Sequence, residues 1–213
     1  EEMVVLSQGK LLTVAELPVH AVYPSRRHLP RRVAIVLDAL SRAFSGAFAT
    51  AAAKRYSPRG VKKWEGWNEP NIILFLYPQY ERRANGWVAV SPQTYSELQQ
   101  SFYTAIKSVD PTAIIGGGVM APVGDPCADA CSFAEREAEP ERIRVRDFLT
   151  ALDQPGRRPK MDVVSHHPYP TSKHESPSSG GCGHCATITM ATLERLLREV
   201  ERAWPGKRVW LTE

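Results

Sequence analysis

Short apolar runs alternate with longer amphipathic stretches along most of this chain. Strand-like runs are predicted at Leu11–Leu17, Val61–Asn68, Ala113–Met120, Met161–Ser165 and Arg208–Thr212. Helix-like periodicity is predicted at Ala34–Arg55, Ser91–Val109, Ile143–Leu152 and Thr187–Trp204. Strands that alternate with helices in this way favour βα units that build a parallel sheet.

Local signals define the ends of two helices. Ser91 and Pro92 are predicted as the N-cap and first residue of one helix, and Asp110-Pro111 ends it. The last helix is predicted to turn one apolar side inward, which carries Ile188, Leu193, Leu196, Leu197 and Val200.

The longest segments without strand or helix periodicity follow the carboxyl ends of predicted strands. They cover residues 71–90, which are rich in aromatic side chains, then residues 121–140 and 171–185. In parallel α/β folds, ligand sites form from the loops after the strands. We therefore expect a site at this edge of the sheet.

Polar, titratable residues stand at three of these strand ends, in Asn68-Glu69-Pro70, His167-Pro168-Tyr169 and Thr212-Glu213. A carboxylate at the end of a buried strand is costly unless it is paired or used. Two such carboxylates suit the cleavage of a glycosidic bond, in which one protonates the leaving oxygen and the other attacks carbon or activates water. Taken alone, Asn-Glu-Pro also fits a turn that starts a helix.

The residues around both carboxylates resemble glycoside hydrolases of clan A. Trp67-Asn68-Glu69-Pro70-Asn71 is similar to the W-N-E-P-N signature that ends the fourth barrel strand, and residues 209–213 are similar to the seventh strand. Residues 162–169 resemble the sixth strand of families such as 5 and 39. The resemblance implies an α/β fold, a (β/α)8 TIM barrel that residues 1–213 complete only in part, with about five βα units that correspond to barrel strands three to seven.

The resemblance also implies roles for individual residues of a retaining enzyme. Glu69 would be the acid/base and Glu213 the nucleophile. Asn68 would hydrogen-bond the sugar 2-hydroxyl, His167 would contact the sugar or the acid/base, and Tyr169 would orient Glu213. The substrates implied are β-linked glucosides, xylosides or mannosides in an oligo- or polysaccharide. No metal or organic cofactor is expected, because this chemistry needs only two carboxylates and water.

Aromatic residues near Glu69 are candidates for stacking on sugar rings, although such side chains more often serve packing. Trp67, Tyr77 and Trp87 are the substrate-binding candidates among them. His166 is expected to be a buried histidine with satisfied hydrogen bonds. A carbohydrate-binding barrel without activity is an alternative, and the presence of both carboxylates argues against it.

Four cysteines lie in the two predicted loops after residues 120 and 165. They are Cys127, Cys131, Cys182 and Cys185. An even number in loops favours disulfides and hence a secreted protein. A zinc site remains an alternative, as does a thiol oxidoreductase, because Cys182-Gly183-His184-Cys185 precedes a helix.

Composition narrows the classes of partner. The chain is 43% hydrophobic with a net charge of +4, typical of a folded domain. Its basic residues occur in scattered pairs, which predicts a solvated surface rather than a nucleic-acid face, and no apolar run is long enough to span a membrane. Because strands one, two and eight are missing from the pattern, we expect exposed sheet edges and poor folding of this fragment alone.

Overall fold

The computed structural model describes residues 3–7, 10–14, 46–124, 140–170, 174, 176, 178 and 187–212. The chain forms two compact units, Glu1–Leu40 and Ser41–Glu213. In the first unit, β1 (Met3–Ser7) pairs antiparallel with β2 (Lys10–Val14). The strand predicted at Leu11–Leu17 is confirmed as far as Val14, with residues 15–17 outside the described part of the chain, but its predicted place in a parallel sheet is wrong. A connection as short as the one between β1 and β2 permits only antiparallel pairing, since parallel neighbours need a crossover of a dozen or more residues.

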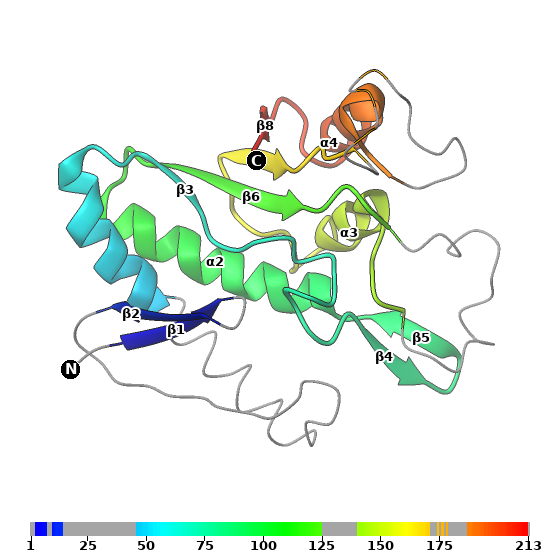
Figure 1. Ribbon diagram of the computed structural model, residues 1–213, viewed down its shortest axis with the longest axis horizontal. Helices are drawn as coiled ribbons and strands as arrows, with labels where there is room; N and C mark the ends of the chain where they lie inside the picture. Colours follow the sequence, from blue (N-terminus) through cyan, green and yellow to red (C-terminus); the bar gives the residue numbers. More distant parts are fainter. Residues whose placement is uncertain are drawn as a thin grey trace. The chain divides into compact units, whose positions relative to one another are not determined.

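The second unit contains the parallel sheet that the sequence predicts. Its strands are β3 (Lys63–Glu65), β6 (Ile114–Met120), β7 (Val163–His166) and β8 (Val209–Leu211). They lie side by side in chain order, and every pairing between them is parallel (Figure 1). In a (β/α)8 barrel each strand lies beside the next one along the chain and runs parallel to it. The fold is therefore an incomplete barrel of this kind.

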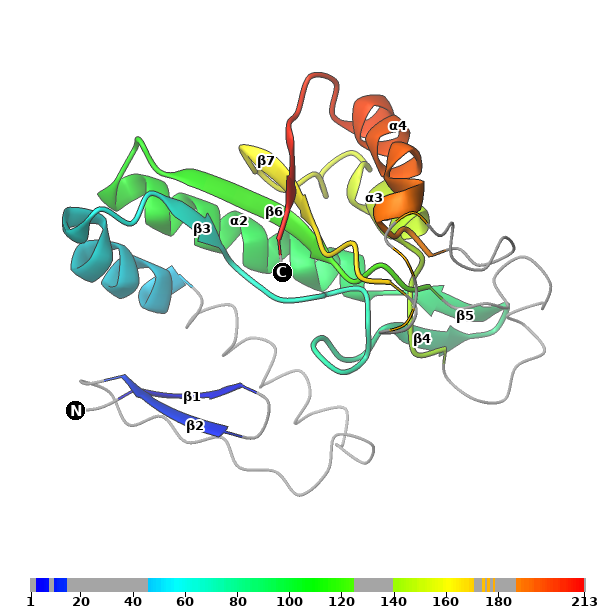
Figure 2. The same cartoon turned by 45° about the horizontal axis from the view of Figure 1, so that its top comes forward.

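Helices precede β3 and fill the connections between the strands that follow it. They are a helix over residues 46–56, α2 (Ser91–Val109), α3 (Val145–Leu152) and α4 (Leu193–Ala203), with short 3-10 turns η2 (Ser57–Arg59) and η3 (Met190–Thr192). Figure 1 shows α2 running beside β6, and Figure 2 shows α3 next to α4. The predicted helices are confirmed, except that residues 34–45 lie outside the described part of the chain.

The main hydrophobic core lies between α2, α3, α4 and the sheet. Phe148, Leu149 and Leu152 of α3 are fully buried in it, as is Leu196 of α4. Leu197 is 48% exposed, so its predicted place on the buried side of the last helix is wrong. The reason is geometric, because residues 193, 196 and 200 share one helix face and position 197 lies about 100° away from position 196.

A smaller core joins the helix over residues 46–56 to α2 and β6. Ala49 and Ala53 belong to this core together with Phe102, Ile106 and Ile115. No helix among the described residues is long and apolar enough to span a bilayer.

The segment predicted as an aromatic loop contains a hairpin, β4 (Tyr80–Arg83) with β5 (Gly86–Ala89). Gln79 closes its base, since its backbone carbonyl accepts from Val90 N and its side-chain amide donates to Pro70 O at 2.9 Å. The Ser91 hydroxyl donates to Gln79 Oε1 at 3.0 Å. The helix begins at Ser91 itself, and its N-cap is Val90. The prediction of Ser91 as the N-cap is therefore wrong by one residue.

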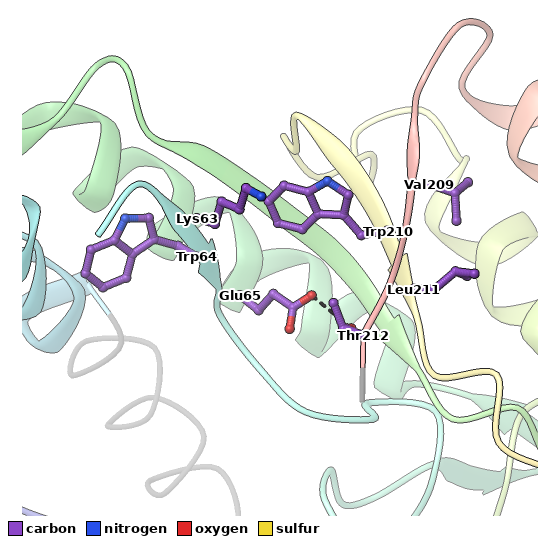
Figure 3. A pocket seen from close by; sticks show the side chains of 7 residues that line it. All are labelled: Lys63, Trp64, Glu65, Val209, Trp210, Leu211 and Thr212. Carbon is purple, nitrogen blue, oxygen red and sulfur yellow. Dashed lines mark hydrogen bonds between the residues drawn. The ribbon is translucent and has the colours of Figure 1, made fainter. Parts of the chain in front are cut away.

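Side chains from the outer strands show that the sheet is strongly curved. β3 and β8 are three positions apart, which would separate them by about 14 Å in a flat sheet. Nevertheless, Thr212 Oγ1 donates to Glu65 Oε1 at 3.3 Å, and Lys63 Nζ lies 5.7 Å from the Trp210 ring (Figure 3). These side chains line one pocket on the face of the sheet opposite the core. Curvature of this degree is typical of a barrel wall.

Candidate active site

The carboxyl ends of β3, β6 and β7 meet at one edge of the sheet, and Glu69 stands there. Its side chain is only 12% exposed, and its backbone N–H donates to Val119 O at 2.9 Å. The backbone of Glu69 has φ = 42°, in the left-handed region that residues other than glycine rarely adopt. Strained backbone of this kind occurs preferentially at functional sites, where surrounding contacts hold it.

The Glu69 carboxylate contacts a histidine from the neighbouring strand end. His167 Nδ1 lies 3.1 Å from Glu69 Oε1, and the His167 side chain is 1% exposed. A ring N–H can donate to the carboxylate, and a protonated carboxyl can donate to the bare ring nitrogen. The contact therefore survives a change in the protonation state of Glu69, as a proton-transferring group requires.

The other two aromatic residues of this strand end differ in exposure. The Tyr169 ring is 38% exposed and lies edge-on to His167, with ring centres 5.7 Å apart. His166 is fully buried, and its Nε2 lies 2.8 Å from Ile188 O. Burial lowers the pKa of His166 to about 4, so its ring is neutral at neutral pH. The predicted burial of His166 is confirmed, but its hydrogen bonds are only half satisfied, because Nδ1 has no hydrogen-bond partner among the described residues.

A β-bulge in β6 shapes the middle of the site. The register against β7 shifts between Gly118 and Met120, which leaves Val119 as the extra residue. Val119 has φ = 45° and Gly118 has φ = 90°. A Cβ at Gly118 would lie 3.1 Å from Ser165 O, so both the conformation and the close approach require glycine at this position.

Asn71 ties the loops around the site together. Its side chain is fully buried, and its amide nitrogen lies 3.1 Å from the carbonyl oxygens of both Ala121 and Ile143, and 3.3 Å from Val123 O. Its Oδ1 accepts from Ala121 N at 2.9 Å. The last residue of the W-N-E-P-N motif therefore has a structural role, joining the segment after Glu69 to the segment after β6.

The remaining predicted substrate contacts are Asn68, Trp67, Tyr77 and Trp87, and their roles stay predictions. Asn68 is half-buried, and its side chain makes no hydrogen bond to any residue that the structure describes. The Trp67 indole donates to Phe75 O at 3.2 Å, and the rings of Trp67 and Trp87 pack against the main core. Tyr77, Trp67 and Trp87 are all half-buried, so sugar stacking by these rings stays a prediction.

Several predicted residues lie outside the described part of the chain. They are Glu213, Cys127, Cys131, Cys182 and Cys185. The nucleophile and the disulfides therefore stay predictions. Among the described residues, no group of three His, Cys, Asp or Glu side chains is arranged to hold a metal ion.

Sequence reasoning missed two residues that build this site. Tyr95 of α2 is fully buried, and its hydroxyl oxygen accepts from Gly118 N at 2.7 Å. Burial raises its pKa, so the phenol stays protonated. Val119 supplies the carbonyl that holds Glu69. The only sequence signal was the run Gly116-Gly117-Gly118, which indicates a bulge or a close approach in a strand.

Comparison with known proteins gives one curated relative. A β-xylosidase of Geobacillus stearothermophilus is 30% identical over 122 residues, which make up 56% of this chain and 18% of the relative. The chain thus spans less than a fifth of that protein's length. No family profile matches the chain. The relative supports the resemblance to glycoside hydrolases that the motifs indicated.

Solved glycosidases also align with the chain. A monomeric β-xylosidase from Caulobacter crescentus CB15 has a TM-score of 0.45 at 21% identity, covering 80% of this chain and 30% of that one. A family 44 endoglucanase from Clostridium thermocellum has a TM-score of 0.45 at 20% identity, covering 78% and 39% of the two chains.

Proposed function

We propose that this chain is part of the catalytic barrel of a retaining glycoside hydrolase, with Glu69 as acid/base and Glu213 as nucleophile. The observation that carries the proposal is Glu69 at a strand end, with a side chain only 12% exposed, a strained backbone and an Oε1 atom 3.1 Å from His167 Nδ1. Little water reaches this carboxyl group, and a neighbouring ring nitrogen can exchange a proton with it. Both properties suit a general acid.

The proposed reaction has two steps. In the first, the Glu213 carboxylate attacks the anomeric carbon while the Glu69 carboxyl gives its proton to the glycosidic oxygen, and the carbon–oxygen bond to the leaving alcohol breaks. In the second, the Glu69 carboxylate takes a proton from water, whose oxygen attacks the anomeric carbon and releases Glu213. This mechanism predicts a distance of about 5–5.5 Å between the two carboxyl groups.

Other residues would support this chemistry. Asn68 has a side-chain amide available for the sugar 2-hydroxyl, a contact that strengthens in the transition state. Tyr169 would orient Glu213. We propose a β-xyloside as the substrate to test first, on the strength of the curated relative.

The variant Glu69→Gln tests the proposal in the whole protein. Rates are compared on 2,4-dinitrophenyl and phenyl β-xylosides, because dinitrophenolate leaves without protonation and phenolate needs it. We expect kcat/KM on the phenyl substrate to fall about 100-fold further than on the dinitrophenyl substrate. Glu81→Gln is the matched control, since Glu81 is an exposed carboxylate of the β4–β5 hairpin that lies 3.7 Å from Arg83 Nη2 and contacts no described residue of the proposed site.

Two results would count against the proposal. An equal loss on both substrates in Glu69→Gln would remove Glu69 as the acid. A folded wild-type protein that binds sugars but hydrolyses no glycoside would instead favour the carbohydrate-binding barrel.

A further inference from the structure

The bulge in β6 connects three parts of the molecule that the sequence keeps far apart. Its consecutive carbonyls face the two neighbouring strand ends: Val119 O accepts from Glu69 N at 2.9 Å, and Met120 O accepts from His167 N at 3.0 Å. The two residues that donate these N–H groups, Glu69 and His167, are also the pair whose side chains meet at 3.1 Å. The orientation of the bulge therefore fixes where the acid/base and its histidine lie.

Helix α2 holds this bulge from the other side. The Tyr95 hydroxyl oxygen accepts from Gly118 N at 2.7 Å and donates to Gln99 Oε1 at 3.3 Å. Gln99 Nε2 in turn donates to Gly116 O at 3.2 Å. Two side chains one helical turn apart thus bind the β6 backbone on both sides of Gly117. All of these groups are buried, so each is costly to leave unpaired.

We propose that Tyr95 is a positioning residue for Glu69, acting through the bulge at Val119; this rests on the proposed role of Glu69 as acid/base. Without the Tyr95 hydroxyl, the Gly118 N–H loses its partner inside the core. Val119 and Glu69 both have left-handed backbones, which persist only where surrounding contacts fix them. The Val119 carbonyl then turns away from Glu69, and the carboxyl group leaves the geometry from which it protonates the leaving oxygen.

The chain offers a matched control on the same helix. The Tyr103 hydroxyl donates to Asp162 Oδ1 at 3.2 Å, and Asp162 Oδ2 accepts from Ile115 N at 2.9 Å. Tyr103 therefore also connects α2 to β6, at the start of the strand rather than at the bulge. Tyr95→Phe and Tyr103→Phe each remove one hydroxyl group and keep the ring, which for Tyr95 includes its packing against Phe148 at 5.7 Å.

The test uses the ratio of kcat/KM on 2,4-dinitrophenyl and phenyl β-xylosides in the whole protein. A loss of acid catalysis raises this ratio, whereas a general loss of folded enzyme lowers both rates alike. We expect Tyr95→Phe to raise the ratio about tenfold and Tyr103→Phe to leave it within about twofold. A rise of the ratio in Glu69→Gln with none in Tyr95→Phe overturns the role of Tyr95 alone. No rise in Glu69→Gln overturns the proposed function, and the role of Tyr95 with it.

A measurement on the wild-type protein does not depend on the folding of any variant. Amide hydrogen exchange of Gly118 and Glu69 is followed by NMR as urea is added. If Tyr95, the bulge and Glu69 act as one unit, both amides are protected and exchange through the same opening. A Glu69 amide that exchanges freely while Gly118 stays protected would overturn the proposal.

Discussion

Asn71→Ala is expected to loosen the connection between the loops that surround Glu69. The substitution removes a buried amide that bonds the carbonyls of Ala121 and Ile143 and accepts from Ala121 N. It leaves the Ala121 N–H and two buried carbonyls short of a partner. An unsatisfied buried N–H costs about 1–3 kcal/mol, and the carbonyls lose less because each has a second lone pair. We therefore expect a loss of roughly 3 kcal/mol in the free energy of unfolding.

The assay is urea denaturation, in which the midpoint should fall without a change in slope. The matched control is Gln93→Ala, because that amide makes one exposed hydrogen bond, to Glu97 at 3.0 Å. The control should change stability by less than about 0.5 kcal/mol. If Asn71→Ala stays within that range as well, the hydrogen bonds of Asn71 contribute no net stability and its role as the tie between the loops is refuted.

Three further predictions concern stability. Between pH 6.5 and about 4, the unfolded chain binds a proton at His166 that the folded chain excludes, so unfolding free energy falls by up to about 3 kcal/mol as pH drops through this window. His166→Gln should flatten that slope in urea titrations; an unchanged slope would contradict it. Leu196→Ala should cost about 2–5 kcal/mol and Leu197→Ala less than 1, and equal losses would place both on one face. Gly118→Ala should cost about 1–2 kcal/mol more than Gly156→Ala in thermal melts, because both have positive φ and only Gly118 lacks room for a Cβ; similar melting points would argue against the close contact.

Much of the fold was predictable because local patterns agree with the tertiary structure. The helix from Ser91 ends at Asp110-Pro111 as its stop signal indicates, and the apolar run at Ala113–Met120 forms β6. The β4–β5 hairpin was not predicted, although Asn85-Gly86 between Tyr80–Arg83 and the apolar run that ends at Ala89 is a hairpin signal. Its closure depends on Gln79, which contacts residues on both sides of it.

The residues of the candidate site were predictable only where titratable side chains follow the ends of predicted strands. Glu69 and His167 were found in this way, and the structure brings them into contact. Tyr95 was not predicted, because a tyrosine on the apolar side of a helix usually serves packing. Only the structure shows that its hydroxyl oxygen accepts from the backbone N–H of Gly118. The left-handed conformation of Val119 gives no sequence signal either, since valine disfavours it. Such conformations are imposed by tertiary contacts.

The most direct test of the proposed function is covalent trapping of the nucleophile. The whole protein is incubated with 2,4-dinitrophenyl 2-deoxy-2-fluoro-β-xyloside, digested, and mapped by mass spectrometry. A fluorosugar attached to Glu213, with no label on Glu69, is the predicted result, because the fluorine slows the second step and the intermediate accumulates. A label on any other residue, or no label in a protein that still hydrolyses xylosides, would contradict a retaining mechanism through Glu213.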